Sequence, residues 1–404
     1  MAAILLLALA AAGGVLTTLQ VILVARLRRR RPPFAPGGPA ARAASRPAAS
    51  SSRLRLSILK PLSGLDEGLE ENLESFADLR GIPYEVILSA AHPDDPAVAV
   101  AEKVLRRFPD GPFRLVVGGP ARAGVVNRKV ERLVSAARVA SGEILLVSDS
   151  NVRVSPDDVA GTIALFDDPG VGCVSNLFVG EGARSPGSVV ESLHLLTFVA
   201  TGAALGEASG VPCVVGKSMA ISRAALEAIG GFASFLDVLA EDQAIGVAVR
   251  KAGFLVAVSP VVVRNVTIER PLGAALARQV RWNKIRWSFS KSLYAGELLL
   301  NPFPVSLLAC GASALAAPTI LSAAAASAGL LLLLRLAQAA ALARLLGADV
   351  PSRQLALMPV KDVLQFGAQF VPLLSREVTW HGHRARLGPG TVLLPSRREP
   401  ALAA

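Results

Sequence analysis

The chain begins with an uncharged, apolar stretch that ends in a run of arginines. Residues 1–25 contain no charged side chain, and the sequence R-L-R-R-R-R starts at Arg26. A stretch of this length spans a bilayer as one helix. The charges follow the apolar segment, whereas in a signal peptide they precede it. The positive-inside rule places the arginine end in the cytoplasm, so we expect a transmembrane helix over residues 1–25 and a cytosolic domain after it.

A β-α-β pattern follows a flexible linker. Residues 26–53 are rich in Arg, Pro, Ala and Ser and have no hydrophobic period, which is typical of a basic tether. From residue 54, short apolar runs typical of strands alternate with segments of helical period. Strands are expected at 54–59, 84–90, 113–117 and 143–148, and helices at 68–78, 97–108 and 129–140. This alternation predicts an open, mostly parallel, Rossmann-like α/β sheet, whose ligands bind beyond the carboxyl ends of the strands.

The same domain continues to residue 271, with longer apolar segments among its elements. Helices are expected at 157–166, 189–205, 223–229 and 241–252. Strands are expected at 171–177, at 211–221 with a turn at Gly216, and at 256–263. We therefore assign residues 54–271 to one cytosolic catalytic or binding domain.

The last third of the chain has the pattern of membrane-associated helices. Residues 272–300 combine basic and aromatic side chains, which favours an amphipathic helix in the headgroup layer. Residues 301–375 contain apolar stretches at 303–321 and 323–346, each long enough to span, and a mixed stretch that spans or lies at the interface. Arg335 inside the second stretch needs a partner or must snorkel. Residues 376–404 form a basic tail, expected to be cytosolic.

Composition supports a membrane protein and argues against a nucleic-acid partner. The 404 residues are 52% hydrophobic, and their formal net charge is +11. The mean hydropathy of +0.49 is too high for an ordinary soluble enzyme. Aromatic residues are only 5%, and the arginines cluster beside the predicted membrane segments, so anionic lipid headgroups explain the charge better than nucleic acid does. The three cysteines lack the spacing of a disulfide framework or a zinc site.

The motif S-D-S-N at residues 148–151 is a candidate metal site. Asp149 stands at the end of an apolar strand, and Asn151 offers a second oxygen ligand two residues later. Mg²⁺ and Mn²⁺ prefer oxygen ligands and are commonly shared with substrate phosphates. In the alternative interpretation, Asp149 only caps the turn that follows.

The motif A-E-D at residues 240–242 is a candidate for acid–base chemistry. A carboxylate placed near a hydroxyl can accept its proton as a general base, and Asp242 is our candidate for that role. Glu241 and Asp242 also stand at the start of a predicted helix, where acidic side chains complement the helix dipole without any catalytic role.

The motif R-Q-V-R-W at residues 278–282 offers basic and aromatic side chains beside the membrane. Arg278 and Arg281 are suited to grip a diphosphate, and Trp282 to stack on a base or sugar. The same residue types are expected of a simple interfacial anchor.

Further polar residues near strand ends are candidates for a nucleotide pocket: Lys60, Asn127 and Lys129. Each is an ordinary surface side chain in the alternative interpretation. The chain lacks G-x-x-x-x-G-K-[ST] and a strand-linked G-x-G-x-x-G, so nucleotide hydrolysis and hydride transfer have no motif to support them.

Taken together and in order, five motifs resemble the ceramide glucosyltransferase family, which includes bacterial hopanoid-associated glycosyltransferases. The motifs are K-P-L-S-G at 60–64, H-P-D-D-P-A at 92–97, S-D-S-N-V-R-V at 148–154, A-E-D at 240–242 and R-Q-V-R-W at 278–282. The resemblance covers roughly residues 54–291 and the flanking membrane layout. It implies a glycosyltransferase A-type open mixed sheet with transmembrane and interfacial helices, and an inverting, metal-assisted displacement at the sugar C1 with UDP as leaving group.

The resemblance also implies roles for individual residues. Asp149 belongs to the metal and diphosphate site, and Asp242 deprotonates the lipid hydroxyl beside the substrate-binding Glu241. The residues that close over the diphosphate are Arg278, Arg281 and Trp282. The residues that match segments near the uridine are Lys60, Asn127 and Lys129.

Two positions depart from the family pattern. Family members have an Asp directly after the strand of the first acidic motif, where this chain has His92, followed by Asp94 and Asp95. Either one of these side chains takes over the uracil or ribose contact, or the contact is lost. The second metal position is Asn151 rather than Asp, which is a neutral and weaker ligand.

The main hypothesis is a multi-pass membrane glycosyltransferase that transfers a sugar from UDP-glucose or UDP-N-acetylglucosamine to a lipid hydroxyl of ceramide or hopanoid type. The Ala- and Arg-rich composition is typical of a GC-rich bacterium, which favours a bacterial inner membrane and a bacterial lipid. A processive polysaccharide synthase shares the acidic motifs and R-x-x-R-W but usually has more spanning helices. A non-catalytic, nucleotide-binding membrane scaffold is the third hypothesis, and His92 is its best support.

Overall fold

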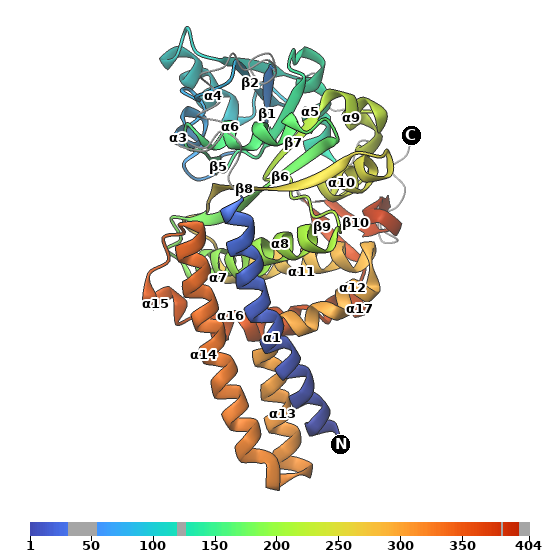
Figure 1. The fold of residues 1–404 in the computed structure, drawn as a ribbon. Coiled ribbons are helices and arrows are strands. Elements are labelled where there is room, and N and C mark those ends of the chain that lie inside the picture. The colour runs from blue at the N-terminus through green and yellow to red at the C-terminus, as the bar shows by residue number, and fades with distance from the viewer. Residues whose placement is uncertain (31–54, 119–126, 381–382, 396–404) are drawn as a thin grey trace. The chain divides into compact units, whose positions relative to one another are not determined.

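A computed structural model describes residues 1–30, 55–118, 127–380 and 383–395 (Figure 1). The chain divides into two compact units. One comprises residues 26–181 and 203–267, and the other comprises residues 1–25, 182–202 and 268–404. Most of the predicted linker and the end of the basic tail lie outside the described residues.

The first unit is built on an eight-stranded mixed sheet with the strand order β3-β2-β1-β4-β7-β6-β8-β5. Its strands are β1 (Leu56–Leu62), β2 (Tyr84–Ala90), β3 (Phe113–Val117), β4 (Ile144–Ser148), β5 (Val152–Arg153), β6 (Val171–Glu181), β7 (Ser218–Ser222) and β8 (Leu255–Val266). Strands β1 to β4 are parallel, whereas β7 runs antiparallel to both β4 and β6. The predicted open α/β sheet is confirmed, and its mixed character comes from β7 and β5.

Helices connect these strands as the alternating pattern predicts. They are α3 (Leu69–Glu74), α4 (Pro96–Arg107), α5 (Arg128–Val139), α6 (Asp158–Ile163), α9 (Arg223–Ala228) and α10 (Glu241–Lys251), with 3₁₀ turns at Ala164–Asp167 and Phe232–Phe235. Helix α5 packs on β1 and β2, and α10 packs on β6 and β8. Helix α4 buries Ala97, Val98, Ala101 and Val104, which repeat at the spacing of one helical face.

Strand β1 does not end at Lys60-Pro61, as the sequence predicted, but continues to Leu62. Its pairing with β4 ends at Leu59, whereas its pairing with β2 continues to Leu62. Beyond Leu59, no strand in the described part of the chain pairs with the β4 side of β1. A proline without an N–H is tolerated there, because a ladder hydrogen bond is missing on that side in any case.

The predicted strand over residues 211–221 is wrong in its first part, because β7 begins only at Ser218. Side chains take the hydrogen bonds that a neighbouring strand would otherwise take. The N–H of Val214 donates to Gln243 Oε1 at 3.0 Å, and the N–H of Val215 donates to Ser175 Oγ at 3.1 Å. The segment before β7 is thus a loop held by side chains of other elements.

The second unit is mainly helical. Its elements include α1 (Ala2–Arg29), α7 (Pro186–His194), the π-helical turn η3 (Leu195–Val199), α8 (Ala200–Ser209), α11 (Leu272–Phe289), α12 (Lys291–Gly296), α13 (Pro302–Ala316), α14 (Leu321–Leu346), α15 (Ser352–Leu355), α16 (Met358–Ala368) and α17 (Val371–Leu374), of which α1 and α8 end within the first unit. Among the described residues, three helices are long and apolar enough to cross a membrane: Ala2–Arg29, Pro186–Ser209 and Pro318–Leu346. The pair Lys291–Leu300 and Pro302–Ala316, bent by 77°, makes a fourth if it counts as one span.

Three of these helices, α1, α13 and α14, pack together through small and apolar residues. Ala10, Val305 and Leu331 form one buried cluster. A Cβ on Gly13 would lie 2.6 Å from the carbonyl oxygen of Leu299, so only glycine allows this approach. Close packing through small residues is how helices associate inside a membrane, where lipid is as apolar as the side chains.

A buried ion-pair cluster explains the charged residue in the apolar helix α14. The Arg335 guanidinium donates to both carboxylate oxygens of Asp362, at 2.8 and 2.9 Å. Lys361 Nζ lies 2.7 Å from Asp362 Oδ1 and donates to Thr197 Oγ1 at 3.0 Å. The expectation that Arg335 needs a partner is confirmed, and the partner comes from α16.

The end of the chain differs from the prediction in two places. The helix predicted from residue 272 breaks at Ser290, whose side chain accepts a hydrogen bond from the N–H of Leu293 and so caps α12. The predicted basic tail contains a three-stranded antiparallel sheet of β9 (Glu377–Trp380), β10 (His383–Leu387) and β11 (Leu393–Pro395). Buried Val378 and Ala385 pair across it, and polar residues flank both: Glu377 and Thr379 in β9, and Arg384 and Arg386 in β10.

Candidate active site

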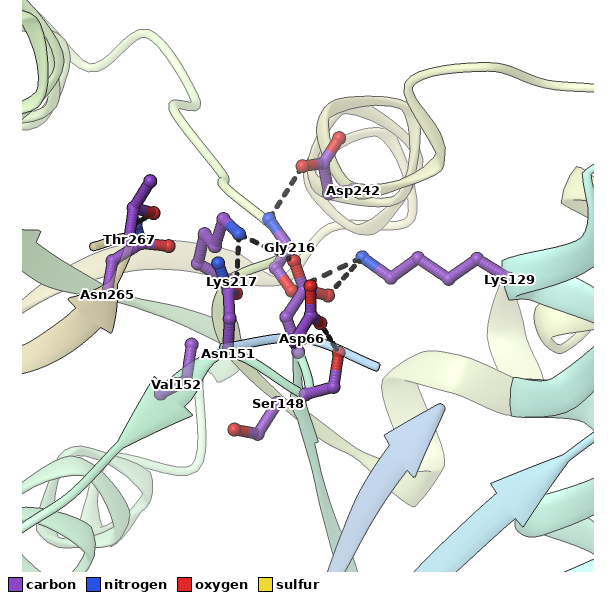
Figure 2. Close-up of polar contacts among 12 residues, drawn as sticks. Asp66, Lys129, Ser148, Asn151, Val152, Gly216, Lys217, Asp242, Asn265 and Thr267 are labelled. Atoms are coloured by element: carbon purple, nitrogen blue, oxygen red, sulfur yellow. Dashed lines mark hydrogen bonds and ion pairs between the residues drawn. The ribbon is translucent and has the colours of Figure 1, made fainter. Parts of the chain in front are cut away.

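Asp149 follows the fully buried strand β4 and lies among three lysines. Its Oδ1 is 2.9 Å from Lys129 Nζ, and its Oδ2 is 3.3 Å from Lys217 Nζ. Its backbone oxygen accepts a hydrogen bond of 2.9 Å from Lys60 Nζ. Figure 2 shows Lys129, which lies in α5, and Lys217, which lies in the turn before β7, and each ammonium pairs with Asp149. The end of β4 is therefore a site where three lysines surround one carboxylate.

The lysines fix the charge of Asp149. Burial alone would raise the pKa of Asp149, but the ammonium groups of Lys129 and Lys217 hold that pKa well below its usual range. Burial would lower the pKa of Lys129, but Asp149 and Glu241 raise it above its usual value. Burial lowers the pKa of Lys60 to about 7, although Asp149 opposes that change. Asp149 is consequently ionised at neutral pH.

The motif A-E-D, at the start of α10, lies beside the motif S-D-S-N. Lys129 Nζ is 3.0 Å from Glu241 Oε1 as well as 2.9 Å from Asp149 Oδ1, so one ammonium joins the two motifs. Asp242 Oδ2 accepts a hydrogen bond of 2.6 Å from the N–H of Gly216, and Oδ1 accepts one of 2.8 Å from the N–H of Gln243 (Figure 2). These bonds hold the Asp242 carboxylate at the start of α10.

Asp242 has the electrostatics of a base that works near neutral pH. Burial and the neighbouring Glu241 raise the pKa of Asp242 to about 6, while Lys129 and the two backbone N–H groups oppose the shift. A carboxylate whose pKa approaches the working pH accepts a proton more readily than one with an ordinary pKa.

Asn127 and Lys60 hold the backbone and the side chains of the two acidic motifs in place. Asn127 is fully buried, and its Oδ1 caps α5 by accepting the N–H groups of Lys129 and Val130. Its Nδ2 donates to Glu241 Oε2 at 3.2 Å. Lys60 is fully buried, with Nζ 4.1 Å from the centroid of the Phe76 ring. Both predicted nucleotide-binding residues therefore position the acidic motifs in this structure.

The two predicted metal ligands, Asp149 and Asn151, both contact the ammonium of Lys217. Asn151 Oδ1 lies 2.8 Å from Lys217 Nζ, the same ammonium that faces Asp149 Oδ2. The described residues contain no group of three or more His, Cys, Asp or Glu that could hold a metal ion. Two oxygens that converge on one cation still fit Mg²⁺ or Mn²⁺, because these ions commonly complete their coordination with substrate phosphate and water.

In the first acidic motif, H-P-D-D-P-A at 92–97, Asp95 is held by hydrogen bonds, whereas His92 and Asp94 are exposed. Asp95 Oδ1 caps α4 by accepting the N–H of Ala97 at 3.0 Å and also accepts the N–H of Gly64 at 2.9 Å, so it ties the loops after β1 and β2 together. The side chains of His92 and Asp94 are 60% and 89% exposed and lie 3.3 Å apart. His92 and Asp94 are thus the members of this motif whose side chains reach solvent.

The arginine motif forms its own cluster in the second unit. Arg278 Nη1 lies 2.8 Å from Glu191 Oε1, and Arg270 Nη1 lies 2.8 Å from Glu191 Oε2. The Trp282 ring stacks on His194, with ring centroids 5.9 Å apart. Burial lowers the pKa of Arg281 to about 10, and the nearby arginines act in the same direction. Arg278 already has a carboxylate partner, so its predicted role as a diphosphate clamp requires a change of partner.

Glu191 and Lys217 are among the residues of these clusters that were not predicted from the sequence. Glu191 is a buried carboxylate between two arginines. A single acidic residue in an otherwise apolar helix could have indicated that it has a buried cationic partner. Lys217 stands in G-K-S, directly before β7, and the sequence offered only a small polar triplet at a predicted turn. Their partners are distant in sequence, so spacing alone did not identify them.

Comparisons with known proteins agree with the motifs. The chain is 27% identical over 261 residues to ceramide glucosyltransferase 3 of Caenorhabditis elegans, covering 64% of this chain and 56% of that protein. It is 26% identical over 247 residues to ceramide glucosyltransferase 1 of the same organism, covering 60% and 52%. These matches thus span about half the length of the relatives.

Among solved structures, a mannosyltransferase from Pyrobaculum calidifontis in complex with GDP-Man and Mn²⁺ is similar, with a TM-score of 0.49 and 21% identity, covering 92% of this chain and 99% of that chain. The family model described as glycosyl transferase family 21 matches residues 5–393. Because that model covers nearly the whole chain, the protein belongs to glycosyl transferase family 21, the ceramide glucosyltransferase family that its motifs predicted.

Proposed function

We propose that the protein is a membrane-bound, inverting glycosyltransferase that moves one sugar from a UDP-sugar to a lipid hydroxyl. The observation that carries the proposal is the ammonium of Lys129, which joins Asp149 to Glu241 next to the half-buried Asp242. It puts a lysine ammonium and the predicted metal ligand Asp149 beside the proposed base. The apolar helices and the ceramide glucosyltransferase relatives support a lipid acceptor.

In the proposed reaction, the chain binds the donor diphosphate and removes one proton. Lys129 offsets the negative charge of the diphosphate, and Asp242 accepts the proton of the acceptor hydroxyl. The hydroxyl oxygen then forms a bond to C1 as the bond from C1 to the phosphate oxygen breaks. Attack from the face opposite the leaving UDP inverts the configuration at C1.

Asp149 and Asn151 are the residues that would hold Mg²⁺ or Mn²⁺. When bound, such an ion supplies charge neutralisation for the diphosphate leaving group. UDP-glucose and UDP-N-acetylglucosamine are the proposed donors, and ceramide or a hopanoid polyol is the proposed acceptor, in a bacterial inner membrane with the first unit in the cytosol.

The remaining motif residues have proposed substrate contacts. His92 and Asp94, which are exposed after β2, are proposed to meet the uracil or the ribose. Arg281 and Trp282 are proposed to close over the diphosphate, together with Arg278 once it leaves Glu191.

The rate of transfer should depend on the ionisation of Asp242. Because burial raises the pKa of Asp242 to about 6, the base is protonated and inactive at lower pH. We expect kcat/KM to fall about tenfold for each pH unit below about 6 and to level off above about 7. Initial rates of glycolipid formation across this range measure the effect. A rate that stays constant down to about pH 4 would contradict the assignment.

The product should carry a single sugar. The described residues offer three candidate spans, or four with the bent pair, whereas a processive polysaccharide synthase needs a secretion channel. Mass spectrometry of the product lipid measures the number of sugars added. A ladder of longer products would favour the synthase, and binding of UDP-sugar without any product would favour the non-catalytic scaffold.

A further inference from the structure

The ammonium of Lys217 lies where the two predicted metal ligands converge. It is 2.8 Å from Asn151 Oδ1 and 3.3 Å from Asp149 Oδ2, and the side chain is only 12% exposed (Figure 2). Both contacts join a cation to oxygen atoms, which is the chemistry that a divalent ion would use at this place. The protein therefore carries its own cation at the predicted metal position.

The backbone holds Lys217 at this place. The carbonyl oxygen of Lys217 accepts a hydrogen bond of 3.2 Å from the N–H of Asp149, and the preceding Gly216 donates its N–H to Asp242 at 2.6 Å. A Cβ on Gly216 would lie 2.8 Å from Lys129 Nζ and 3.1 Å from the Asp242 side chain. The Gly216-Lys217 pair thus links the proposed base to the proposed metal and diphosphate site, and its close packing requires glycine.

We propose that Lys217 is a resident counter-cation, whose ammonium holds the divalent-ion position until metal and donor bind and then transfers to the donor diphosphate. The inference rests on the proposed function. An ammonium and a divalent ion cannot both contact the same two oxygens without strong repulsion, so the ion has to displace Lys217. The displaced ammonium needs an anion, and the diphosphate provides one.

The consequence is a coupling between metal and nucleotide. Metal alone must compete with Lys217 and binds weakly. Nucleotide diphosphate stabilises the displaced lysine, so each ligand strengthens the binding of the other, by reciprocal linkage. A lysine that only stabilises the fold would show no such coupling, which separates the two roles.

The test is binding of Mn²⁺ to the purified full chain in detergent, followed by the electron paramagnetic resonance signal of free Mn²⁺, with and without UDP. For the wild type we expect UDP to tighten Mn²⁺ binding by about tenfold or more. In Lys217→Met, Mn²⁺ alone should bind about tenfold more tightly, and the effect of UDP should shrink accordingly. Lys217→Gln should behave like Lys217→Met, because both remove the charge.

Two control variants are needed. One keeps a positive charge at position 217, and the other replaces a lysine far from the site. Lys217→Arg preserves the cation and should keep the strong UDP dependence. Lys251→Met, at an exposed position in the last turn of α10, should match the wild type. Thermal unfolding of every variant verifies that it is folded, and Lys217→Gln replaces Lys217→Met if the latter does not fold.

The outcomes separate this inference from the proposed function. A wild type that binds Mn²⁺ and UDP, with neutral Lys217 variants whose Mn²⁺ affinity is unchanged or weaker, overturns the role of Lys217 alone. The same holds if Lys217→Arg behaves like Lys217→Met. A wild type that binds neither Mn²⁺ nor UDP overturns the proposed function, and the role of Lys217 with it.

Discussion

Asp242→Asn should lower the rate of sugar transfer by about 10² to 10⁴-fold, because it removes the proposed base while keeping the size of the side chain. Both oxygens of Asp242 accept backbone N–H groups, from Gly216 and Gln243, and asparagine keeps one of these acceptors. The fold and the binding of UDP-sugar should therefore persist. The measurement is the initial rate of glycolipid formation at saturating donor.

Asp237→Asn is the matched control, because Asp237 is an exposed acid five residues earlier in the chain. It should keep the rate of the wild type. Turnover retained in a folded Asp242→Asn protein would rule out Asp242 as the base and would turn attention to Glu241.

Asp362→Ala should destabilise the helical unit by about 3–5 kcal/mol, because it leaves the buried Arg335 guanidinium without its partner. Asp362 accepts two hydrogen bonds from that guanidinium, which also donates to Gln338, and Asp362 faces Lys361 as well, so one carboxylate lies beside two buried cations. The side chains of Arg335 and Asp362 are 2% and 1% exposed, so water does not compensate for the loss. Thermal unfolding in detergent, with the yield of folded protein, measures the effect.

The control for this change is Asp349→Ala, which removes an exposed acid in the loop after α14. It should leave the unfolding temperature nearly unchanged. An Asp362→Ala protein as stable as this control would mean that the ion-pair cluster contributes nothing to stability.

The order of the sheet's elements along the chain and the position of Asp149 at a strand end could be predicted from local pattern. Alternating apolar runs identified β1 to β4, and the rule that ligands bind at the carboxyl ends of strands predicted that Asp149 faces a ligand site. Lys129 does join Asp149 to Glu241. The strands and the position of Asp149 could be predicted because the apolar or polar character of adjacent residues is enough to identify them.

The features that local pattern did not predict depend on partners distant in sequence. The loop before β7 has apolar residues like a strand, but side chains from β6 and α10 take its hydrogen bonds. Glu191 pairs with Arg278 from another helix, 87 residues away. The basic tail forms a sheet because its few apolar residues pair across strands. Tertiary contacts of this kind override what a window of sequence predicts.

The most direct test of the proposed function is transfer of labelled sugar to lipid by the purified protein. The protein in detergent receives radiolabelled UDP-glucose or UDP-N-acetylglucosamine, Mg²⁺ or Mn²⁺, and lipid acceptors including ceramide and bacteriohopanetetrol. We predict one labelled glycolipid, which disappears when a chelator removes the metal and when Asp242 is replaced by Asn. Intact UDP-sugar with no labelled lipid for any donor and acceptor would contradict the assignment of a lipid glycosyltransferase.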